Sequence, residues 1–210
     1  RYRFGAIEIG STGAAITVHN ARGVNAAMSI VSFSGLIGHG QRGIGLHLDV
    51  SEEGVCTDRF EGMDISGFDT GIRIAERPGG EPWKTDTNWF FVNSIRRCNT
   101  CISEMHVGVD DNVFRVSLDT TLPNSVGIRT AGYAGRFDVM MSDSCGVGTH
   151  AVVLEPRARG NVFEFHPPID SFDWEDNSSE PSNIMLSTTR APYSTGLPPE
   201  PAAEGASPSE

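Results

Sequence analysis

The sequence contains very little of the residues that usually cover the surface of an α-helix. Among its 210 residues there are one lysine, one glutamine and only 8 leucines, whereas isoleucine and valine together number 30. Lysine, glutamine and leucine favour helices, and β-branched residues favour strands. The 24 glycines exceed the usual share of about 7% and supply turns. The composition therefore predicts an all-β chain.

The sequence also lacks long apolar runs and an excess of basic residues. It contains no stretch of about 18 apolar residues, which excludes a membrane span. Lysine and arginine number 16 against 27 acidic residues, giving a net charge of −11. This charge argues against nucleic acid as a partner, because phosphate binding needs clustered basic side chains. The four cysteines are too few for a disulfide scaffold in a chain of this size.

The last twenty residues differ from the rest in composition. Residues 191–210 contain five prolines and no isoleucine, valine or phenylalanine. Such a segment cannot bury enough apolar surface to offset the entropy that ordering costs. We therefore predict a proline-rich tail that is flexible or held by a partner. Because the chain begins at Arg1 and not at methionine, we also expect that an N-terminal piece is missing.

Two series of residues repeat with a common period. Phenylalanines recur every 23 to 30 residues, at Phe33, Phe60, Phe90, Phe114, Phe137 and Phe163. A small residue followed by an aliphatic one recurs every 24 to 30 residues, starting at Ala15, Gly45, Gly71, Cys101, Gly127 and Ala151. Two independent series with one period indicate a structural repeat.

Within each repeat, apolar and polar residues alternate with the period of a β-strand. Phe114, Val116 and Leu118, for example, alternate with Arg115 and Ser117. This pattern is typical of strands with one buried face. A unit of about 25 residues with two or three short strands and no helix fits one coil of a parallel β-helix. Eight leucines are too few for leucine-rich repeats, and WD40 blades need about 40–45 residues.

The repeats predict a single-stranded right-handed parallel β-helix of about six coils. Like residues of successive coils would stack about 4.8 Å apart as ladders inside the tube. We assign the β-helix to residues 1–167, a partial last coil or irregular cap to residues 168–190, and the tail to residues 191–210.

The ladders resemble the right-handed parallel β-helix of the pectin-lyase-like superfamily over roughly residues 7–167. The resemblance rests on the small-aliphatic series and on three Asn-x-Phe motifs, at residues 88–90, 112–114 and 161–163. The superfamily includes polysaccharide lyases, polygalacturonases, viral tailspikes and fibres, and surface adhesins. In character the chain is closest to the viral tailspike, fibre and decoration β-helices.

The catalytic motifs of polygalacturonase-like enzymes are incomplete in this sequence. Those enzymes carry Asn-Thr-Asp, Asp-Asp, Gly-His-Gly and Arg-Ile-Lys in that order, and their carboxylates act as acid and base. In this sequence the order is reversed, because Gly-His-Gly at residues 38–40 precedes Asp-Asp at residues 110–111. The Asn-Thr pair at residues 99–100 is followed by Cys101 and not by aspartate, and Arg-Ile-Lys does not occur. Three coils separate the two sites by about 14 Å, beyond the 5–9.5 Å or so that a carboxylate pair needs. We therefore assign no catalytic residue.

Acidic residues raise the alternative of a calcium site, as in pectate-lyase-like enzymes. The candidate ligands are Asp64, Asp69, Asp138 and Asp143. A calcium site requires several converging oxygen ligands, and the simpler interpretation is that these aspartates are outward residues of alternating strands. We predict no cofactor, with calcium as the alternative.

Two further motifs have structural interpretations. Residues 38–43 match the dinucleotide-binding fingerprint, but residues 44–50 continue as a strand where that fold needs a helix, so we predict a glycine-rich corner. Cys98 and Cys101, alone or together with Cys56 and Cys145, could indicate zinc or redox chemistry. They replace a phenylalanine and a glycine of the preceding repeat, which favours buried thiols in packing positions.

Two aromatic segments are candidates for contacts with a glycan or a partner. Residues 77–89 form an insertion in which Trp83, Asp86 and Trp89 could meet a sugar. Trp174 lies in a second aromatic and acidic segment, whose expected role is to cover the open end of the tube, with a binding site as the alternative.

We expect a non-enzymatic structural or receptor-facing virion protein, such as a head-decoration, head-fibre or tail-fibre module. It would be a homotrimer, located in the virion or outside the cell, that contacts other virion proteins through the missing N-terminal piece and the tail. The alternatives are a polysaccharide lyase or glycoside hydrolase of the same superfamily, and a carbohydrate-binding surface adhesin.

Overall fold

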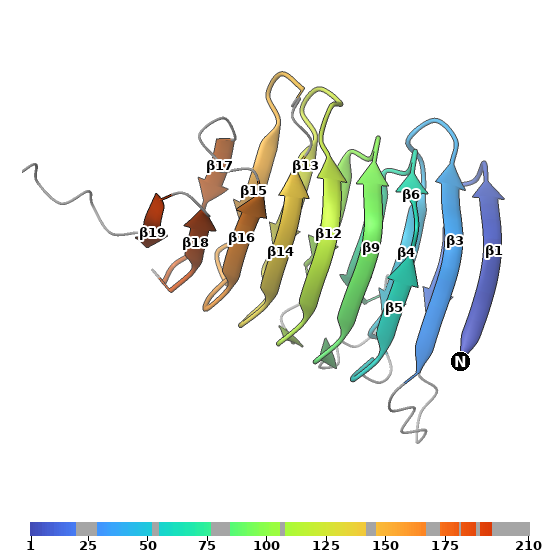
Figure 1. Cartoon of the computed structure of the whole chain (residues 1–210), viewed down its shortest axis with the longest axis horizontal. Helices are drawn as coiled ribbons and strands as arrows, with labels where there is room; N and C mark the ends of the chain where they lie inside the picture. Colours follow the sequence, from blue (N-terminus) through green and yellow to red (C-terminus); the bar gives the residue numbers. More distant parts are fainter. Residues whose placement is uncertain are drawn as a thin grey trace, which may run out of the picture.

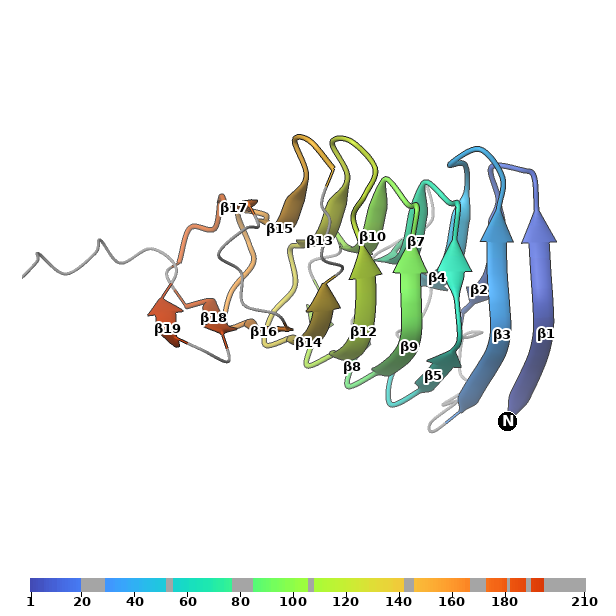
Figure 2. The ribbon, with the colours of Figure 1, turned by 45° about the horizontal axis from the view of Figure 1, so that its top comes forward.

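The structure is a parallel β-solenoid of about six turns (Figures 1 and 2). The computed structural model describes residues 1–19, 29–51, 55–76, 85–105, 108–141, 146–166, 173–180, 182–187 and 190–194. Within these ranges all regular secondary structure is β-strand. None of the described residues form a helix that could cross a membrane. The prediction of an all-β parallel β-helix is confirmed.

The first wall of the tube, wall A, is a ten-stranded sheet. Its strands pair in parallel from coil to coil, except for the last pair, β18 and β19, which is antiparallel. Wall A consists of β1 (Tyr2–Ile9), β3 (Ile30–Gly38), β5 (Arg59–Gly62), β6 (Ile65–Ser66), β9 (Trp89–Arg96), β12 (Val113–Asp119), β14 (Arg136–Met141), β16 (Val162–His166), β18 (Ile184–Ser187) and β19 (Arg190–Ser194).

The second and third walls close the tube. Wall B is a seven-stranded parallel sheet made of β2 (Ala14–Val18), β4 (Ile44–Asp49), β7 (Thr70–Ala75), β10 (Thr100–Glu104), β13 (Val126–Thr130), β15 (His150–Leu154) and β17 (Asp173–Asp176). Wall C is short: β8 (Thr85–Asp86) pairs with β11 (Val109–Asp110), and single bridges continue the line from Asp110 to Tyr133 and on to Arg159.

The phenylalanine ladder is real, but Phe33 does not belong to it. The rings of Phe60, Phe90, Phe114, Phe137 and Phe163 stack in order, with centroids 4.4 to 5.0 Å apart and planes within 12°. Val31 pairs with Phe60, whereas Phe33 pairs with Gly62. A Cβ on Gly62 would lie 2.2 Å from the Phe33 ring. The ring thus occupies the space that a side chain at position 62 would need.

The small-aliphatic series forms the facing ladder on wall B. The aliphatic residues pair in register through six successive coils, as Ile16, Leu46, Ile72, Ile102, Ile128 and Val152. The preceding residue must be small because the next coil passes close to it. A Cβ on Gly45, Gly71 or Gly127 would lie 2.6 Å from a carbonyl oxygen of the following coil.

The Asn-x-Phe motif marks the corner where wall C turns into wall A. The residue before each motif has a left-handed backbone, with φ of 56° at Thr87 and 50° at Asp111. The next residue is a buried asparagine whose amide bonds to the neighbouring coil: Asn88 Nδ2 donates to Asn112 Oδ1 at 3.1 Å. Gly135 stands where the ladder would have an asparagine, and its N–H donates to Asn161 Oδ1 at 2.9 Å. The stacked asparagine side chains therefore provide hydrogen-bond partners for backbone N–H groups at this corner.

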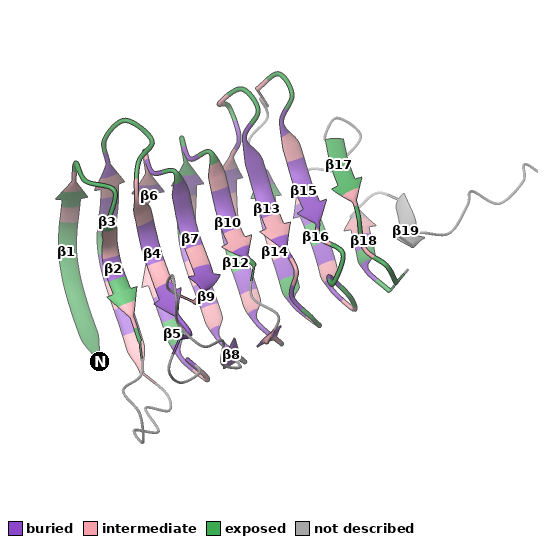
Figure 3. Cartoon of the chain, turned by 180° about the vertical axis from the view of Figure 1, so that it is seen from behind, coloured by how far each residue is buried: buried purple, intermediate pink, exposed green. Residues whose placement is uncertain are grey.

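The C-terminal end is less covered than the middle of the tube. Strands β17 and β18 pair with β15 and β16 and begin another coil. Figure 3 shows buried residues along the inner strands from β3 to β16, whereas β1 and β17 are largely exposed. The chain continues as β19 to Ser194, and residues 195–210 of the predicted tail lie outside the described residues.

Candidate functional site

Of the residues predicted to contact a glycan or a partner, Trp89 and Trp174 have described side chains, and these lie on different walls. Trp83 and the side chain of Asp86 lie outside the described residues, although the backbone of Asp86 belongs to β8 of wall C. Trp89 begins β9 on wall A and is half-buried. Trp174, 37% exposed, lies in β17 on wall B and pairs with Val152 at the end of the aliphatic ladder. Trp174 is therefore separate from Trp89, in agreement with its assignment to a second segment.

The aspartates considered for calcium have other partners. Asp64 pairs with Arg96 at 2.9 Å, Asp69 accepts a hydrogen bond from Asn99 at 2.9 Å, and Asp143 lies outside the described residues. In the part of the chain that the structure describes, no three histidine, cysteine, aspartate or glutamate side chains are placed to hold a metal ion.

The glycine-rich and cysteine motifs are structural. Gly40 and Gly43 have φ of 76° and 71° at the turn after β3, and strand β4 follows instead of a helix, as predicted. Cys98 and Cys101 are buried, and burial raises the pKa of Cys98 to about 12. The pKa of the Cys101 thiol is also raised well above its ordinary value by burial. Protonated, buried thiols are poor metal ligands and poor nucleophiles. Cys145 lies outside the described residues.

Glu104 is a carboxyl group buried inside the tube. Glu104 occupies an inward position between Ile74 and Thr130 of the neighbouring coils and is 1% exposed. Thr130 Oγ1 donates to it at 3.0 Å, and Asn112 Nδ2 donates to it at 3.4 Å. Burial raises its pKa from 4.5 to about 7, and these two hydrogen bonds only partly oppose the rise. The charge pattern of the sequence did not indicate this residue.

A group of charged residues, the wall cluster, lies on the outer face of wall A. It consists of Arg115, Asp138, Glu164 and His166, on three adjacent strands. Arg115 Nε lies 2.8 Å from Asp138, and His166 Nε2 lies 3.6 Å from Asp138 and 3.5 Å from Glu164. A shallow depression of about 440 Å³ is lined by three of these residues, Arg115, Asp138 and His166, and also by Asn93 and Met140.

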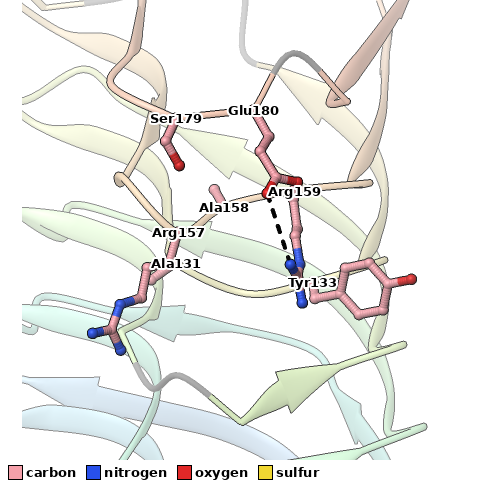
Figure 4. Close-up of a pocket in the computed structure, with 7 residues that line it drawn as sticks. All are labelled: Ala131, Tyr133, Arg157, Ala158, Arg159, Ser179 and Glu180. Carbon is pink, nitrogen blue, oxygen red and sulfur yellow. Dashed lines mark ion pairs between the residues drawn. The ribbon is translucent and has the colours of Figure 1, made fainter.

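A more enclosed depression, the corner hollow, lies where wall B turns towards wall C. It has a volume of about 360 Å³ and is lined by Ala131, Tyr133, Arg157, Ala158, Arg159, Ser179 and Glu180 (Figure 4). The residues come from the loops that follow β13, β15 and β17, so three successive coils build it. Two alanines leave room for the depression between the longer side chains.

Backbone hydrogen bonds between coils hold the loops of the corner hollow. Tyr133 N donates to Val109 O at 2.9 Å, and Arg159 N donates to Gly132 O at 3.2 Å. The third loop is attached through Ser179, whose N–H and hydroxyl both donate to Pro156 O, at 3.1 and 2.9 Å. These bonds make the hollow part of the solenoid and not a separate flexible loop.

The two arginines of the corner hollow differ in their partners. The Arg159 guanidinium lies over the Tyr133 ring, 5.0 Å from its centroid, and 4.0 Å from the Glu180 carboxylate. Arg157 is exposed and forms no ion pair or hydrogen bond with any residue that the structure describes. The hollow therefore combines one paired cation, one unpaired cation and an exposed aromatic ring.

Sequence reasoning missed the corner hollow, although a signal for part of it exists. Tyr133 and Arg159 are 26 residues apart, the same spacing as Phe137 and Phe163, so both occupy the same position of successive coils. The Ser179 loop has no such register with them. Comparison of the chain with protein-family models, with curated proteins and with solved structures found no match.

Proposed function

We propose that the chain is a non-enzymatic, receptor-facing β-helix module of a virus particle, of the head-decoration, head-fibre or tail-fibre type. The observation that supports this proposal is the corner hollow: a polar depression built from three successive coils of a rigid solenoid. Hydrogen bonds between stacked coils hold such a depression in a fixed shape, and a preorganised shape favours recognition. The proposal also places the chain with the viral members of the pectin-lyase-like superfamily and predicts homotrimers.

Binding to cell surfaces and solution mass test this proposal. Fluorescently labelled protein should bind the surface of a subset of bacterial strains, and the bound glycan should be recovered at its original length. Analytical ultracentrifugation should give three times the 22.6 kDa of the single chain. The proposal fails if the protein shortens the glycans that it binds, or if it binds no cell surface in a broad strain panel.

The wall cluster supports a second candidate, a glycoside hydrolase or polysaccharide lyase. Because Asp138 and Glu164 both lie within 3.6 Å of His166 Nε2, their nearest oxygens are no more than about 7 Å apart, and glycosidase carboxylate pairs lie about 5–9.5 Å apart. This function predicts release of reducing ends or unsaturated products from an acidic polysaccharide, and loss of that release in Asp138→Asn and Glu164→Gln. An unchanged polysaccharide chain length would eliminate it.

A further inference from the structure

We propose that the corner hollow binds a saccharide that bears an acidic group, with Arg157 holding the anion. This inference rests on the proposed receptor-facing function and adds a site and a ligand class to it. It follows from the charge, the shape and the position of the residues that line the hollow.

Arg157 is an exposed arginine that has no carboxylate partner among the described residues. The chain has 16 basic and 27 acidic residues, and about half of the arginines whose side chains are described, Arg96 and Arg115 among them, pair with a neighbouring carboxylate. Arg157 instead lies exposed at the edge of a concave surface without such a partner in the described residues. An arginine in a depression offers a planar set of donors that suits a carboxylate or a sulfate.

The opposite side of the hollow suits a sugar ring. Figure 4 shows Arg157 and Tyr133 on opposite sides of Ala158. Tyr133 is 46% exposed and combines an apolar ring face with a hydroxyl group. The Arg159 guanidinium covers part of this ring. Its ion pair with Glu180 is long, at 4.0 Å, and therefore weak, so both side chains can form hydrogen bonds to a ligand at little cost.

The size and lining of the hollow favour a short stretch of saccharide over an isolated ion. A volume of about 360 Å³ lies in the lower range of small-molecule sites, about 300–1,000 Å³, and far exceeds what a single inorganic anion fills. Ser179 and Glu180 add hydroxyl and carboxylate oxygens to the arginine donors. Glu180 and the nearby Asp110, which precedes Tyr133 in the wall C ladder, disfavour a polyanion along the whole hollow. One acidic group, placed at Arg157, fits this distribution.

Calorimetric titration of the full chain tests the inference. The probes are 3′-sialyllactose, which carries one carboxylate, and 3′-sulfolactose, which carries one sulfate, each compared with the neutral sugar lactose. At least one acidic probe should bind, and its affinity should fall as the salt concentration rises. The two acidic probes separate a carboxylate from a sulfate as the recognised group.

Substitutions assign the binding to the corner hollow. Arg157→Gln should weaken the binding about 10- to 100-fold, the usual effect of losing a charge-assisted hydrogen bond, and Arg157→Lys should retain part of the affinity. The control is Arg42→Gln, which removes another exposed arginine near the other end of the tube and should leave the affinity unchanged. Both positions are exposed, so circular dichroism of the variants should match that of the unchanged protein.

Three results would overturn the inference: no acidic probe binds, a neutral probe binds equally well, or Arg157→Gln binds with unchanged affinity. These results differ from a failure of the proposed function. A chain that binds cells through neutral glycans would keep the receptor-facing function and lose the acidic ligand, whereas a chain that binds no cells would lose the receptor-facing function.

Discussion

Replacing Glu104 by glutamine should change how the stability of the solenoid depends on pH. In the folded chain this carboxyl is buried between two coils and has a pKa of about 7, against an ordinary value of 4.5. Below pH 4.5 the side chain is neutral in both the folded and the unfolded states. Between pH 4.5 and 7 the unfolded chain releases the proton and the folded chain keeps it, so stability falls as pH rises.

The size of this effect follows from the shift in pKa. One pKa unit corresponds to about 1.36 kcal/mol, so the rise from 4.5 to about 7 destabilises the folded state by about 3 kcal/mol at pH 8.5. Glutamine has the same shape and no charge. We expect Glu104→Gln to match the unchanged protein within about 1 kcal/mol at pH 4.5 and to exceed its stability by about 3 kcal/mol at pH 8.5.

Urea unfolding followed by circular dichroism, at half-unit steps from pH 4.5 to 8.5, measures this difference. The matched control is Glu175→Gln, which neutralises an exposed glutamate on β17 and should leave the difference near zero at every pH. If Glu104→Gln and the unchanged protein keep a constant difference across the pH range, the carboxyl is ionised inside the tube or is not buried, and the reasoning fails.

Three further substitutions, together with one control at Gly5, test the packing of the tube by the free energy of unfolding in urea. Phe114→Ala removes the ring between two stacked neighbours at 4.4 and 5.0 Å, and we expect a loss of about 3–5 kcal/mol; a loss below 1 kcal/mol would contradict the ladder. Gly43→Ala places a Cβ 2.4 Å from the Gly13 carbonyl at φ of 71° and should cost about 2 kcal/mol or more, whereas Gly5→Ala meets nothing within 4 Å and should be nearly neutral. Asn161→Ala removes the buried acceptor of a backbone N–H and should cost about 1–3 kcal/mol, and an unchanged midpoint would show that the amide ladder adds no stability.

The sequence by itself determined the solenoid and its interior ladders. Each coil stacks its residues on the equivalent positions of the previous coil. The packing requirement at one position therefore recurs once per coil and appears in the sequence as a period. The stack from Phe60 to Phe163 and the glycines before the aliphatic ladder follow directly from this repetition. The buried positions of Cys98 and Cys101 could be inferred for the same reason, because sister coils place a phenylalanine and a glycine there.

The exact register and the surface sites were decided only by the tertiary structure. Phe33 has the right spacing for the ladder, but its pairing depends on how β3 aligns with β5, and that alignment places it over Gly62. Glu104 became a buried acid because its strand position faces inward, although the chemistry of its side chain favours the surface. The corner hollow needs loops of three coils to meet, and loop length varies without a period. Repetition therefore fixes the interior, whereas the loops that differ between coils determine where a ligand can bind.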